Sequence, residues 1–171
     1  MKDFRPAGLR YGLGDFTALI NAISRQEGSM NADGSWNTSS VGYRNNNPTN
    51  LGYAGQPGAS PVTIYDPVAG TNVTYAAFDT LADGIAAAGR QLSLDASRGL
   101  TLAQRIATWS TANHQAYINN VSSWLGVDPS TPLSTIEGTS SPPDFRLVPS
   151  QPPAAEQMPR GESISPSDPA D

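Results

Sequence analysis

Glu27 is the residue of this chain best suited to acid–base chemistry, because it is the only glutamate among the first 136 residues. The stretch before it carries Phe16, Leu19, Ile20 and Ile23 at the spacing of an apolar helix face. Eleven steps of about 100° from Phe16 bring Glu27 back to within roughly 20° of that face. The glycine that follows is typical of a helix end, where burial and the helix dipole both disfavour a carboxylate. A glutamate near a helix end is often a solvated surface residue, but here it could be the protonated acid that glycosidic-bond cleavage requires.

The loop over residues 42–53, GYRNNNPTNLGY, is the second stretch with chemical potential. Asparagine side chains offer two donors and an acceptor, which suits sugar hydroxyl and N-acetyl groups, and tyrosines offer a face for a sugar ring. The same composition is typical of turns, so each asparagine has a purely structural interpretation as well. The residues of this loop that we expect to bind substrate are Arg44, Asn46, Asn47, Asn50 and Tyr53.

Four segments, in their order along the chain, are similar to those of a known family. SRQEG, RNNNPTNLGY, YAAFDTLADGIAAAGRQL and AYINNVSSWLGV together resemble the lysozyme-like domains of phage and prophage muralytic proteins, which are relatives of lytic transglycosylases and endolysins. The resemblance covers about residues 16–127, and Thr49 stands where these proteins commonly have glycine. It implies a lysozyme-like fold with a small β element beside the cleft.

The resemblance also implies roles for individual residues. Glu27 would be the general acid, and Asn47, Asn50 and Tyr117 would line or shape the cleft. Tyr117 lies on the apolar stripe of its own predicted helix, so a core tyrosine with its hydroxyl at the edge is an equally good interpretation.

The reaction implied is cleavage between N-acetylmuramic acid and N-acetylglucosamine in peptidoglycan glycan strands. In a lytic transglycosylase the same glutamate then acts as base on the sugar's C6 hydroxyl, whereas a lysozyme uses a second carboxylate. Asp33, Asp66 and Asp79 are the candidates for that second carboxylate, but Asp33 fits an ordinary turn and Asp79 a helix cap. The sequence therefore favours the transglycosylase, with no cofactor and no metal.

The elements that must position these residues are predicted from periodicity and turn chemistry. We expect a helix over 15–26 with Asp15 as N-cap, a loop over 28–50, and strand-like runs at 51–53, 62–65 and 73–78, the last two forming a hairpin. Three more helices should begin at Asp79 or Thr80, after Thr101 and near Asn113, the last one ending at Gly126. This order predicts a mostly helical α+β fold. We divide the chain into a lead-in over 1–14, the folded domain over 15–127, and an extended Pro/Ser-rich tail over 128–171.

Composition limits the partners that the protein can have. The net charge is −5 with a single lysine and scattered arginines, which disfavours nucleic-acid binding, and no apolar run is long enough to span a membrane. The N-terminus lacks the apolar core of a signal peptide, so we expect synthesis in the host cytoplasm and delivery to the periplasm by a phage, in the virion or after release. The tail could contact other virion proteins. A virion structural component with little activity, or a glycan-binding module, remains an alternative.

Overall fold

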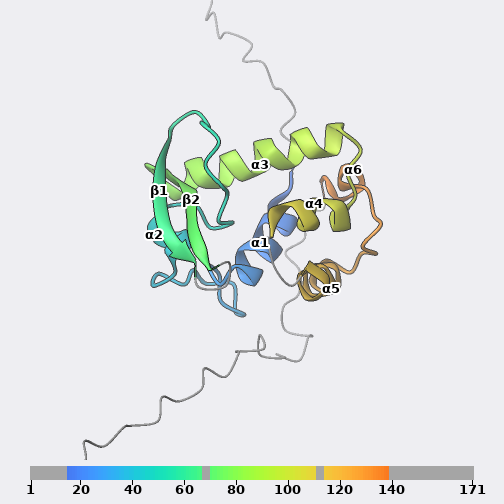
Figure 1. Cartoon of the computed structure of the whole chain (residues 1–171). Helices are drawn as coiled ribbons and strands as arrows, with labels where there is room; N and C mark the ends of the chain where they lie inside the picture. The colour runs from blue at the N-terminus through green and yellow to red at the C-terminus, as the bar shows by residue number, and fades with distance from the viewer. Residues whose placement is uncertain (1–14, 67–69, 111–113, 139–171) are drawn as a thin grey trace, which may run out of the picture.

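The mostly helical α+β architecture expected from the sequence is confirmed in the computed structural model, which describes residues 15–66, 70–110 and 114–138 (Figure 1). One short hairpin lies to one side of the helices. The elements, in chain order, are α1 (Thr17–Gln26), α2 (Val41–Arg44), β1 (Ala59–Asp66), β2 (Thr71–Phe78), α3 (Leu81–Ser97), α4 (Leu102–Trp109), α5 (His114–Leu125) and α6 (Leu133–Ile136).

The hairpin β1–β2 is antiparallel and continuous from Ala59 opposite Phe78 to Asp66 opposite Thr71. Its two strands contain the predicted runs 62–65 and 73–78, and the Thr63 and Thr74 hydroxyls bond across it at 2.9 Å. The predicted third run, 51–53, forms only an isolated bridge between Gly52 and Tyr75. The sheet is therefore narrower than expected, and the 51–53 segment lies along its edge without becoming a strand.

Helix α1 lies at the centre of the helical part and supplies much of its core (Figure 1). Leu19 and Ile23 on its apolar face are fully buried, and α3, α4, α5 and α6 contribute the other members of the same core. Burying a side chain of this size stabilises the fold by about 1.5–3 kcal/mol. The apolar stripe that follows from the 3.6-residue period thus fixes which way α1 faces, and with it the direction of Glu27.

Helix α3 connects the helical core to the hairpin. Ala88 and Leu92 belong to the core around α1, while Ala87 packs with Phe78 and Leu51 in a second, smaller core under the hairpin. Thr80 caps this helix, because its hydroxyl accepts the Asp83 N–H at 3.2 Å, as its sequence predicts. The hairpin and α1 consequently pack against the same helix, α3.

The starts of two other helices show how well local signals work. Thr101 and Gln104 form a complete capping box at the start of α4, where the helix was expected. At α1 the N-cap is Phe16 and not Asp15, but the Asp15 carboxylate still accepts the Thr17 N–H at 3.1 Å. The predicted start of α1 is wrong by one position, although the predicted carboxylate cap of its first turn is present.

The folded part continues beyond the expected boundary at residue 127. Leu133 and Ile136 of α6 are buried in the main core, the Leu133 N–H donates to the Leu100 carbonyl, and the Gly138 N–H donates to the Asp15 carbonyl. The prediction that the tail begins at residue 128 is therefore wrong. Two apolar residues among prolines and serines are enough to complete a core, and average composition hides them. The expected lead-in, 1–14, and the rest of the expected tail, 139–171, lie outside the described residues.

Candidate active site

Glu27 is the C-terminal cap residue of α1. Its N–H continues the helix by donating to the Ile23 carbonyl at 2.9 Å, and Gly28 then takes a φ of 73°, which glycine adopts without strain. The sequence therefore ends the helix directly after the carboxylate. The Glu27 side chain is half-buried, and it lies at the negative end of the helix, as predicted.

Two uncharged donors hold the Glu27 carboxylate. Asn50 Nδ2 donates to Oε2 at 2.9 Å, and the Tyr117 hydroxyl donates to Oε1 at 2.8 Å. These three residues come from α1, from the asparagine-rich loop and from α5, so the tertiary fold assembles the group. Of the predicted site residues, Glu27, Asn50 and Tyr117 are the ones brought together here.

Burial decides the ionisation of the group. Loss of solvent raises the pKa of Glu27 above its ordinary value, the hydrogen bonds from Asn50 and Tyr117 oppose that rise, and the charge of Asp66 adds to it. Burial and the nearby carboxylate also raise the pKa of the Tyr117 hydroxyl well above that of a free phenol. Tyr117 therefore remains protonated at neutral pH and acts as a donor to Glu27.

A pocket of about 370 Å³ opens in front of Glu27. The end of α1, the start of α2 and the half of the hairpin nearer its turn form its wall. Pockets that hold small molecules span about 300–1,000 Å³, so this one has room for part of a sugar chain. The lining residues are Glu27, Ser40, Val41, Gly42, Asn50, Ile64, Tyr65, Asp66 and Tyr75.

Asp66 is the candidate second carboxylate that the fold brings into this pocket. It is the last residue of β1, its charge raises the pKa of Glu27, and its side chain is hydrogen-bonded to that of Tyr75. Asp33 instead accepts the N–H and hydroxyl of Ser35 in an exposed turn, at 2.9 and 2.6 Å. Asp79 is exposed and does not line the pocket. The site therefore contains two carboxylates, not the one on which the sequence prediction depended.

Asn47 does not reach the pocket. Its side chain is 1% exposed, Nδ2 donates to the carbonyls of Leu51 and Ala76 at 2.9 and 2.8 Å, and Oδ1 accepts the Leu51 N–H at 2.9 Å. The Ala76 N–H in turn donates to the Leu51 carbonyl. Both amide hydrogens are used inside the protein, so the expectation that Asn47 binds substrate is corrected to a structural role at the outer edge of β2.

Asn46 has a similar structural role one step along the same edge. Its Nδ2 donates to the carbonyls of Phe78 and Asp79 at 2.9 and 3.0 Å. Its φ is 51°, a left-handed conformation that asparagine tolerates better than most residues. The asparagine loop therefore satisfies backbone groups that a third strand would otherwise satisfy, and an exposed sheet edge is avoided.

The remaining two predicted binding residues lie outside the pocket lining. Arg44 is exposed at the end of α2, and Tyr53 is 38% exposed beside β2, where its N–H donates to the Thr74 carbonyl. Neither residue belongs to the lining of the pocket in front of Glu27. A direct role for Arg44 or Tyr53 would require substrate that extends beyond this pocket.

Sequence reasoning missed the short helix α2 and the hairpin side chains Ile64, Tyr65 and Tyr75, and it named Asp66 only as one of three candidate carboxylates. Ser40 caps α2 by accepting the Tyr43 N–H at 3.1 Å, a signal hidden in a stretch predicted to be loop. A side chain at Gly42 would collide with Ser29 and lie within 2.9 Å of Asn50 and the Asn47 carbonyl, so only glycine fits there. The alternation of β1 could have indicated that Ile64 and Asp66 share one face of the hairpin.

Comparison of the chain with protein-family models, with curated proteins and with solved structures finds no match. Within the described ranges, no three His, Asp or Glu side chains gather as metal ligands, and none of the helices there is long and apolar enough to cross a membrane. The chemistry assigned to the pocket therefore depends on the geometry of Glu27 and its neighbours.

Proposed function

We propose that the protein cleaves the glycosidic bond between N-acetylmuramic acid and N-acetylglucosamine in peptidoglycan, with Glu27 as the proton donor. The observation that carries this proposal is a carboxyl group with a raised pKa, held by two uncharged donors at the wall of an open pocket. Departure of a sugar oxygen requires such an acid, because the leaving alkoxide is too basic to leave unprotonated.

The fold that we propose is lysozyme-like. Support comes from the resemblance of the four sequence segments and from the arrangement of a mostly helical body with a small hairpin beside the pocket. Phage origin, action in the periplasm after delivery, and contact of the tail with virion proteins remain predictions from the sequence. The glycan strand is the proposed partner.

The fate of the sugar after proton transfer distinguishes two candidate reactions. If Glu27 alone acts, it takes the C6 hydroxyl proton of the substrate and a 1,6-anhydro product results, as the sequence favours. The position of Asp66 in the same pocket favours the second candidate, hydrolysis, because a second carboxylate beside the substrate can assist water or the sugar cation. Replacing Asp66 by asparagine should leave a transglycosylase active and slow a hydrolase by an order of magnitude or more, as expected for loss of a positioned base.

The test is digestion of Gram-negative sacculi followed by mass spectrometry of the soluble muropeptides. Wild type, Glu27→Gln and Asp66→Asn are compared, and Asp33→Asn is the matched control because it removes a carboxylate that lies in an exposed turn. Wild type and Asp33→Asn should release the same products, and Glu27→Gln should release none. Anhydro ends identify the transglycosylase, and reducing ends identify the hydrolase.

Two results would reject the proposal. A fully active Glu27→Gln variant would exclude Glu27 as the acid. A folded wild type that releases no product would favour the alternative of a virion structural component, which co-purification with particles at fixed copy number would support. A folded wild type that binds sacculi without releasing product, with binding unaffected by Glu27→Gln, would instead favour a glycan-binding module.

A further inference from the structure

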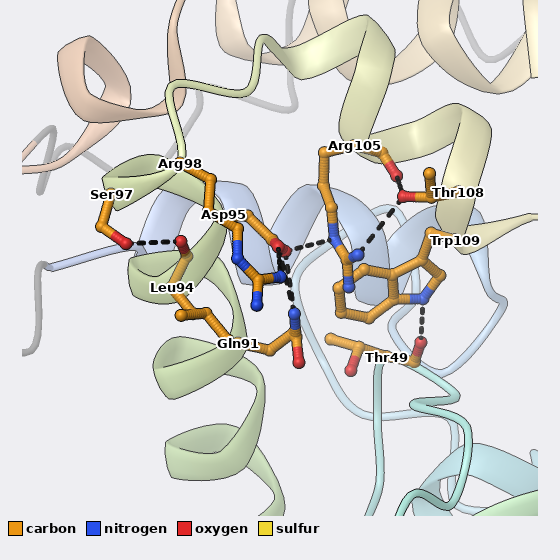
Figure 2. A network of polar contacts seen from close by, with 9 residues as sticks. All are labelled: Thr49, Gln91, Leu94, Asp95, Ser97, Arg98, Arg105, Thr108 and Trp109. Carbon is orange, nitrogen blue, oxygen red and sulfur yellow. Dashed lines mark hydrogen bonds and ion pairs between the residues drawn. The ribbon is translucent and has the colours of Figure 1, made fainter.

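A buried ion pair joins α3 and α4, and neither of its residues lines the pocket. Asp95 is 2% exposed, and its Oδ2 lies 3.0 Å from Arg105 Nε. Gln91 Nε2 lies 3.1 Å from each carboxylate oxygen of Asp95, and Arg98 approaches from the surface at 3.8 Å (Figure 2). A buried ion pair of this kind costs desolvation energy, and replacing it by apolar side chains is often neutral or stabilising. Stability alone therefore does not explain the pair.

The Arg105 guanidinium also contacts a residue that reaches the asparagine-rich loop over residues 42–53. It stacks 4.1 Å from the centre of the Trp109 ring, and Trp109 Nε1 donates to the Thr49 carbonyl at 2.8 Å (Figure 2). Thr49 is fully buried and immediately precedes Asn50, whose amide holds Glu27. A continuous series of contacts thus runs from Asp95 to the donor on one side of the acid.

The same guanidinium also acts on the donor on the other side of the acid. The charge of Arg105 opposes the rise in the pKa of Tyr117 that burial and Glu27 cause. Both groups that donate to Glu27 therefore depend on the placement of Arg105. The charge of Arg105 acts on Tyr117 directly, whereas Arg105 acts on Asn50 through its contacts with Trp109 and Thr49.

We propose that Asp95, Arg105 and Trp109 are positioning residues, which fix the Thr49–Asn50 segment so that the Asn50 amide donates to Glu27. Asp95 holds the guanidinium, the guanidinium orients the indole, and the indole N–H fixes the loop carbonyl. The consequence for catalysis rests on the proposed function, but the consequence for the Glu27 carboxyl group does not. The two can therefore be measured separately.

Trp109→Phe is the variant that tests this, because it keeps an aromatic ring beneath Arg105 and removes the N–H that reaches Thr49. Trp124→Phe is the matched control. Trp124 is also half-buried against the main core and also lies beneath an arginine, with Arg25 at 4.3 Å. It lies on α5, away from the Thr49–Asn50 segment in sequence and contacts.

The primary measurement is the NMR titration of glutamate carboxyl carbons, which needs no substrate. The chain has four glutamates, Glu27, Glu137, Glu156 and Glu162, and Glu27→Gln assigns the resonance of interest by its disappearance. Because the Asn50 hydrogen bond lowers the pKa of Glu27, loosening Asn50 in Trp109→Phe should move the Glu27 titration to higher pH. Trp124→Phe should titrate as wild type does.

The second measurement is turnover of sacculi by the same variants. Loss of one oriented hydrogen bond should lower kcat for Trp109→Phe by up to about tenfold and move its pH profile with the Glu27 titration, at unchanged KM. An unchanged Glu27 titration in folded Trp109→Phe, with only a lower Tm, would show that the contacts are merely structural and would overturn the inference.

Two other outcomes are covered by the design. If Trp109→Phe does not fold, Arg105→Lys takes its place, since lysine keeps the charge beside Asp95 and loses the planar stacking on Trp109. It should move the Glu27 titration in the same direction, and a wild-type titration would overturn the inference. If wild type releases no product, the proposed function fails, while the carboxyl titration still decides the positioning role.

Discussion

Replacing Asn47 by alanine should destabilise the protein strongly, because Asn47 is a structural residue and not a binding residue. The change removes three buried hydrogen bonds, to the Leu51 carbonyl, the Ala76 carbonyl and the Leu51 N–H, at 2.8–2.9 Å. At a net value of about 1 kcal/mol each, the free energy of unfolding should fall by about 3 kcal/mol. For a domain of this size, that corresponds to a decrease in Tm of about 12 °C.

Urea and thermal denaturation followed by circular dichroism give both quantities. Asn45→Ala is the matched control, since no hydrogen bond of the Asn45 side chain is seen among the described residues. Its free energy of unfolding should stay within about 0.5 kcal/mol of the wild-type value. At a temperature where Asn47→Ala is fully folded, its KM for sacculi should equal that of the wild type.

The opposite pattern would refute this reasoning. An Asn47→Ala variant whose free energy of unfolding falls by less than about 1 kcal/mol and which binds glycan strands more weakly would mean that the Asn47 amide binds substrate. The hydrogen bonds to Leu51 and Ala76 would then contribute little to holding the outer edge of β2. Such a result would restore the interpretation that the sequence first favoured.

Three further predictions follow from the site and the loop beside it. The difference in Tm between Glu27→Gln and wild type should grow in favour of the variant as pH rises. The reason is that the pKa of Glu27 is higher in the native than in the unfolded protein, so its protonated form stabilises the wild type fully below the unfolded pKa, and this stabilisation is lost as pH passes through the raised value. A Tm difference independent of pH would contradict this. Tyr117→Phe should lower kcat about tenfold at similar KM and move the pH profile upward, since it deletes a bond that lowers the pKa of Glu27; an unchanged profile would mean that the hydroxyl is only a core group. Gly84→Ala should lower the free energy of unfolding, measured in denaturant, by about 1–3 kcal/mol, because a Cβ there would collide with the Asn46 carbonyl. An unfolding midpoint equal to that of the wild type would mean that the loop around Asn46 moves to accommodate the methyl group.

Local signals predicted the parts of the fold that depend on neighbouring residues. The periodicity before Glu27 gave the direction of α1, and turn residues after Asp66 indicated the hairpin. Thr101 marked the start of α4, where the structure adds Gln104 as its capping-box partner. In each case the groups that interact lie within a few positions of one another, so their spacing carries the information.

The roles of the asparagines could not be predicted in this way. Asn46, Asn47 and Asn50 carry identical amides, which suit sugar hydroxyls and backbone carbonyls equally well. Their partners at Phe78, Ala76 and Glu27 lie 23 to 32 positions away. Only the register of the loop against β2 separates two structural amides from the one that reaches the acid.

Asp66 was one of three candidates for the second carboxylate, and the sequence could not single it out for a related reason. Asp33 lies close to Glu27 in sequence, but its carboxylate is occupied by Ser35 in a turn. Asp66 is 39 positions from Glu27, and the hairpin carries it to the pocket. Distance along the chain is a poor guide to which acids share a site, whereas the end of a strand beside a cleft is a position from which side chains reach it.

The neighbours of Glu27 suit a residue that must both give and take a proton. An arginine or lysine bound to the carboxylate would hold it ionised and lower its pKa, so it would be a poor acid. The Asn50 amide and the Tyr117 hydroxyl instead carry no charge, and burial outweighs their effect on the pKa of Glu27. They orient the carboxylate in its ionised form without preventing its protonation. Tyr117 cannot accept the proton in its place, because its own pKa is raised well above that of a free phenol, so it stays a donor. Among these three groups the proton exchange falls to Glu27 alone, which is what a reaction with one acid that later serves as base demands.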